Sequence, residues 1–173
     1  MNIGSFFATF FKRSYPRLYR KEFAEAYYKR ELFNGFKLSL NGRYENRGSM
    51  KNNSNYSFFF KDRTFDPNLY IPDHKAIITY ISVSFKPFNK YMSLPDSKIN
   101  MGSTWPLLEF TYSRAWARQD NYSNYQRIHA SLSGQFSLGI FGNTRWKTRA
   151  GKYLDQSQVF TPDLFHYPGN EVY

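Results

Sequence analysis

The sequence contains no cysteine, which excludes a disulfide framework, a thiol nucleophile and a cysteine-based metal site. It also has no run of about 18 apolar residues, so a transmembrane helix is excluded. Acidic residues are scarce: 13 Asp and Glu stand against 24 Lys and Arg, for a formal charge of +11. This excess fits a solvated basic surface, a nucleic-acid-binding surface, a surface facing anionic lipid headgroups or a cationic pore lining. The charges form no long Lys/Arg run and no RNA-binding signature, which argues against nucleic acid as a partner.

Signatures of catalysis are lacking as well. No serine lies in a glycine-flanked nucleophile elbow. Glu45 and Glu109 could serve as a general acid and base. The only feature that they share is a position on the polar side of an alternating segment, so ion pairs with arginines are the preferred interpretation. The three histidines are far apart in the chain and lie in no metal-ligand spacing: His74, His129 and His166. We therefore expect no enzymatic activity, no metal and no cofactor.

What the sequence does have is a long stretch of strict alternation, from Arg127 to Leu138. Apolar residues occupy the even positions and mostly polar residues the odd ones, which predicts a strand with one apolar and one wet face. Ordinary globular strands have about five or six residues, whereas a tilted strand needs about 9–11 to cross a bilayer. This strand is therefore long enough to span a membrane.

Aromatic residues are unusually frequent for so polar a chain. They make up 21% of the sequence, with 15 Tyr and 18 Phe, while the mean hydropathy is −0.66. Two environments accommodate both properties: a soluble all-β domain, or a transmembrane barrel with aromatic girdles and a polar interior.

Further strands surround this one. Asn34-Gly35 predicts a hairpin turn between an incoming arm at 22–33 and an outgoing arm at 36–45. The incoming arm is also a fair helix by propensity, but we favour a strand because the turn needs a partner strand. Additional strands are expected at 76–86, 107–117 and 144–153, with a tight turn at 139–143 and connectors at 46–75, 88–106 and 119–124.

Together these elements predict an all-β fold, an antiparallel meander of five or six strands. The short turns fall at one end, and the long polar loop at 46–75 falls at the other, as in outer-membrane barrels with short periplasmic turns and long exterior loops. The connector at 88–106 is longer than this pattern expects. A soluble sheet with one covered face alternates in the same way, so a soluble β-sandwich or barrel stays open at this point.

Four phrases of the sequence resemble an outer-membrane family of unknown function from Bacteroidota-type bacteria, DUF5686. The phrases are YYKRELFNGF, FFFKDR, KINMGSTWP and FHYPGN, at 27–36, 58–63, 98–106 and 165–170. The resemblance covers about residues 15–170 and implies the β-barrel region of that family, whose full-length members carry an N-terminal carboxypeptidase-regulatory-like domain. It therefore implies that residues 1–173 form part of a single barrel domain, incomplete at both ends.

We thus expect a partial outer-membrane β-barrel without enzymatic activity, whose partners are lipid and the remainder of the same polypeptide. Its role could be solute passage, surface attachment or envelope assembly; the alternative is a soluble, basic, all-β module that binds a polyanion or a glycan. The residues expected to face lipid are Leu38, Leu40, Ile81, Val83, Phe110, Ile128, Leu132 and Phe136.

Basic residues lie at the alternate positions of these strands, on the side opposite the lipid-facing residues, and are expected to face the barrel lumen. They could form a cationic lining, or they could pair with Glu45, Glu109 and other acidic residues to brace a plugged barrel, which is the preferred interpretation. The lumen-facing basic residues are Lys37, Arg43, Arg127, Arg145, Lys147 and Arg149.

Overall fold

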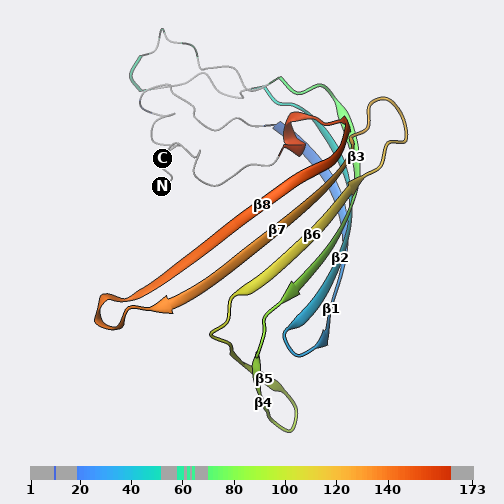
Figure 1. Cartoon of the computed structure of the whole chain (residues 1–173). Coiled ribbons are helices and arrows are strands. Elements are labelled where there is room, and N and C mark those ends of the chain that lie inside the picture. Colours follow the sequence, from blue (N-terminus) through green and yellow to red (C-terminus); the bar gives the residue numbers. More distant parts are fainter. Residues whose placement is uncertain are drawn as a thin grey trace.

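The computed structural model describes residues 10, 19–51, 58–60, 62, 64 and 70–164, and β-strands dominate this part of the chain (Figure 1). Six strands form one sheet in the order β1-β2-β3-β6-β7-β8, and each pairs antiparallel with its neighbours. The predicted antiparallel meander is therefore confirmed. The strands are β1 (Tyr19–Phe33), β2 (Phe36–Ser49), β3 (His74–Phe85), β6 (Leu107–Ala115), β7 (Asn124–Ser137) and β8 (Asn143–Gln158).

The incoming arm of the first hairpin is a strand, as favoured, and pairs with β2 over its length from Tyr19 to Phe33. Cross-strand pairing thus overrides the helix propensity of its Glu, Ala and Lys residues. The turn requires glycine, because Gly35 has φ +80° and a Cβ there would lie 2.2 Å from the carbonyl oxygen of Lys86. The amide of Gly35 also donates a hydrogen bond of 2.9 Å to Glu31.

Several strands are longer than their alternation predicts. Pairing of Arg47 with His74 extends β2 and β3 into the polar segment, so the connection between them covers 50–73 rather than 46–75. Part of this connection lies outside the described residues. Likewise, β8 continues to Gln158, past register shifts opposite the start of β7. Backbone hydrogen bonds continue a ladder where the side-chain pattern has already faded.

The predicted connector at 88–106 contains a small hairpin of its own, made of β4 (Lys90–Ser93) and β5 (Lys98–Gly102). The amide of Leu94 donates to the carbonyl of Ser97 at 2.8 Å and closes the turn. The Tyr91 hydroxyl donates a hydrogen bond to the Glu31 carboxylate, which raises the pKa of Tyr91 and ties this hairpin to the end of β1. Strands of four or five residues are too short to show a clear period.

The two ends of the sheet differ. The turn end carries the Asn34-Gly35 turn, the insert at 86–106 and the 3₁₀ turn η1 (Gly139–Phe141), whereas the loop end carries the connections at 50–73 and 116–123 (Figure 1). The sheet is curved and open, with β1 and β8 as its edge strands in the part of the chain that the structure describes. No helix among the described residues is long and apolar enough to cross a membrane.

The sheet has a polar face, which carries Arg43 and Arg127, and an apolar face, which carries Ile81 and Leu132. Its small buried core lies on the polar face, near the loop end, and η2 (Thr161–Asp163) folds back against it. The apolar face has no comparable buried cluster within the described ranges. The buried core residues are Ala76, Ile78, Ala115 and Tyr125, and Tyr80, Tyr153 and Val159 pack against them.

Candidate functional site

The structure places all residues expected to face lipid on the apolar face. Leu38 pairs with Val83, which pairs with Phe110, and residues paired across an antiparallel sheet share a face. Many of these side chains are open to solvent in the chain alone: 40% of Ile81, 48% of Phe110, 36% of Leu132 and 50% of Phe136 are exposed. Contact with lipid itself stays a prediction.

The apolar face is hollowed at its centre. A cavity of about 440 Å³ opens there, lined mainly by apolar side chains of four neighbouring strands. Its wall includes Val83, Phe110, Leu132 and Ala150. Monomeric soluble proteins seldom leave so extended an apolar surface uncovered, so this face needs a lipid or protein neighbour.

The basic residues expected to face a lumen all lie on the polar face, but they fall into two groups. The first group joins a cluster near the loop end that is centred on Arg47, a residue outside the predicted set. Arg47 is buried between two carboxylates, 2.5 Å from Glu45 and 2.6 Å from Asp163. Asp163 also accepts a hydrogen bond of 2.7 Å from the Ser123 hydroxyl. Because each buried charge has an opposite partner, this cluster holds η2 against the sheet.

Two of the predicted basic residues belong to this loop-end cluster. Arg43 lies 3.0 Å from Glu25 and 3.3 Å from Glu45. Arg127 donates a hydrogen bond of 3.2 Å to the backbone carbonyl of Asp163 and lies over the ring of Tyr153. At this end, the basic side chains are paired with acidic residues or backbone carbonyls, whereas the bracing of a plugged barrel stays a prediction.

The remaining basic residues lie toward the turn end, and they are mostly uncompensated. Lys147 forms an exposed ion pair of 3.3 Å with Glu109. Lys37, Arg145 and Arg149 have no carboxylate within ion-pair distance among the residues that the structure describes. The basic set is therefore split, with its uncompensated charge at one end of the sheet.

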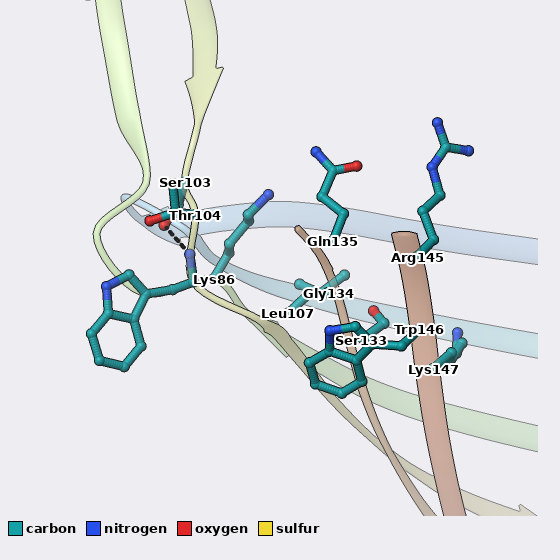
Figure 2. A pocket seen from close by; sticks show the side chains of 11 residues that line it. Lys86, Ser103, Thr104, Leu107, Ser133, Gly134, Gln135, Arg145, Trp146 and Lys147 are labelled. Carbon is teal, nitrogen blue, oxygen red and sulfur yellow. Dashed lines mark hydrogen bonds between the residues drawn. The ribbon is translucent and has the colours of Figure 1, made fainter. Parts of the chain in front are cut away.

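A second cavity of about 440 Å³ lies among these turn-end cations (Figure 2). Figure 2 shows Lys86 and Ser103 on one side of it, and Arg145 and Lys147 of β8 on the other. The sequence analysis did not select Lys86, which directly follows β3. The rest of the insert brings Ser103 to the same cavity as Lys86.

An acid–base pair of Glu45 and Glu109 is not formed. Glu45 pairs with Ala76 and Glu109 pairs with Ser84, eight residues further along β3. At about 3.4 Å per residue, their positions are about 27 Å apart along the strand. Each carboxylate instead pairs with a cation of the polar face.

The histidines do not come together either. The His74 ring stacks on Phe160 at 3.9 Å, near the loop end, whereas His129 lies between Thr111 and Gly151 on the polar face. His166 lies outside the described residues. Within the described ranges, no group of three or more His, Cys, Asp or Glu residues could hold a metal ion.

Fold and faces together define an all-β protein built on one open antiparallel sheet, with an exposed apolar face and a charged polar face. The chain belongs to the family of unknown function DUF5686, because the model of that family's C-terminal domain matches residues 2–173. No curated protein and no solved structure matches the chain.

Proposed function

We propose that this sheet is the membrane-spanning wall of a bacterial outer-membrane β-barrel with a non-enzymatic role, such as solute passage, surface attachment or envelope assembly. One observation carries the proposal. The buried core lies on the charged face of the sheet, while the apolar face, with Ile81, Phe110 and Leu132, stays exposed. In a water-soluble sheet the opposite is expected, because burial of apolar side chains drives the packing of a second layer.

The dimensions of the apolar face support this proposal. On β7 the apolar positions run from Ile128 to Phe136, which is nine residues. At about 3.4 Å per residue and a tilt of about 40°, they cover about 23 Å along the membrane normal. Outer-membrane barrels have an apolar band of about 25 Å.

The arrangement of hydrogen bonds supports it as well. In hydrocarbon every backbone polar group needs a partner, so a sheet can span a bilayer only as a closed barrel. The free edges of β1 and β8 would therefore pair with further strands, which we assign to the remainder of the same polypeptide. The aromatic side chains of Phe36, Phe85 and Trp146 at the turn end fit a position at the membrane interface.

Nitroxide scanning along β7 tests the proposal. The chain has no cysteine, so single-cysteine variants at successive positions from Ile128 to Phe136 each carry one label here. With the full-length protein in lipid vesicles, we expect labels at even positions to collide with molecular oxygen and labels at odd positions with a water-soluble nickel chelate. Low accessibility to both reagents at the even positions would place the apolar face in a protein core and refute the proposal.

A further inference from the structure

We propose that the turn-end cavity on the polar face binds a small phosphorylated solute, of about the size of a sugar phosphate. Its cations differ from those at the loop end. Lys86 and Arg145 line the cavity and have no carboxylate within ion-pair distance among the described residues. Lys147 contributes a third positive charge, and its partner Glu109 leaves it 40% exposed.

The cavity also supplies neutral hydrogen-bonding groups. Ser133 and Gln135 of β7 lie between the cations of β8 and the insert (Figure 2). Their side chains form no hydrogen bond with any other described residue, so they are available to a ligand. Hydroxyl and amide groups beside Arg and Lys suit an anion that carries additional hydroxyls.

The spacing of the charges favours a phosphate group over a monovalent ion. Arg145 and Lys147 are two residues apart on one face of β8, so their Cα atoms lie about 7 Å apart, and both side chains can approach one anion. The planar guanidinium binds two phosphate oxygens at once, and lysine adds a point charge. A phosphate carries enough acceptor oxygens to engage both groups together.

The space around the cavity sets the size of the ligand. It adjoins a larger hollow of about 890 Å³, which shares Lys86, Trp105 and Gln135 and adds Lys90. The Trp105 side chain is 55% exposed, and its flat ring can receive the apolar face of a sugar. A phosphate near Arg145 would therefore leave room for a sugar ring toward the insert.

The experiment is a titration of the full-length protein in detergent with glucose 1-phosphate at constant ionic strength, with glucose as the uncharged control. We expect saturable binding of the phosphate and none of glucose. The variants Lys86→Gln and Arg145→Gln should each weaken binding about 1.5- to 5-fold, as for partly exposed charge pairs. The matched control is Lys152→Gln, which removes the same charge from the opposite face of β8 and should leave binding unchanged.

A short-chain phosphatidate, used below its micelle concentration, distinguishes a lipid headgroup from a soluble phosphate. Because the cations that line the cavity belong to the polar face, we expect the sugar phosphate to bind more tightly; preference for the lipid would overturn the proposal. Equal affinities for the wild type, Lys86→Gln and Arg145→Gln would also overturn it, provided that thermal unfolding shows the variants folded. The nitroxide scan reports on the apolar face alone, so a negative scan would refute the proposed membrane wall without affecting the phosphate site. A negative titration would likewise refute the phosphate site without affecting the scan.

Discussion

Replacing Leu132 with arginine is the most direct energetic test of the apolar face. Leu132 is the midpoint of the apolar run from Ile128 to Phe136 and points away from the charged core. An arginine at the bilayer midplane of a barrel costs about 2–4 kcal/mol. The equilibrium constant for folding into the membrane should therefore fall by about 30- to 700-fold.

The matched control is Ser133→Arg, which places the same side chain one residue further on, at the polar face. Ser131 is less suitable, because it is buried and donates a hydrogen bond of 2.9 Å to Glu109. Folding of the full-length protein into lipid vesicles is followed by tryptophan fluorescence during urea titration. Ser133 is half-buried and pairs with Lys147, so Ser133→Arg adds a cross-strand repulsion between like charges, and we expect it to cost about 1 kcal/mol or less. Equal losses in the two variants would refute the assignment of the apolar face to lipid.

Three further substitutions test the polar face and the turn end. Arg47→Ala leaves the buried Asp163 carboxylate without its cation, while Glu45 keeps Arg43 and Lys21, and should lower the free energy of unfolding by about 3–5 kcal/mol; a loss below 1 kcal/mol in urea unfolding would show that this cluster is not a brace. Lys147→Gln removes an exposed ion pair and should change stability by less than about 1 kcal/mol in the same assay, so a larger loss would contradict the exposure of that pair. At Gly134 a Cβ would lie 2.8 Å from the indole of Trp146, so Gly134→Ala should displace this ring, shift its fluorescence and cost about 1 kcal/mol; an unchanged spectrum would mean that the indole does not cover the glycine.

The sequence predicted the two faces well, for a simple physical reason. Side chains of a strand alternate with a period of two, so parity alone assigns each residue to a face once the strand is recognised. Leu38, Phe110 and Leu132 accordingly share one face, and Arg43 and Arg127 share the other. The Asn34-Gly35 turn also fixed the pairing of β1 with β2, although β1 has the composition of a fair helix.

The alternation of side chains could not predict which charged residues form ion pairs. Arg47 and Asp163 are 116 residues apart in the chain, and their ion pair depends on how η2 folds back over the end of the sheet. The sequence shows nothing periodic in the short η2 segment. The role of Lys86 was missed for a related reason, because the insert that places Ser103 beside it carries only the short strands β4 and β5.

In the structure, the paired and the uncompensated basic residues of the polar face lie at different ends of the sheet. Burial decides the outcome, because an unpaired cation removed from water costs several kcal/mol, whereas an exposed cation costs little. At the loop end, Arg47 is buried and therefore needs Glu45 and Asp163. At the turn end, Arg145 remains exposed and keeps its charge available. In the proposed barrel wall, we therefore expect the loop end to be held by its ion pairs and the turn end to attract anions.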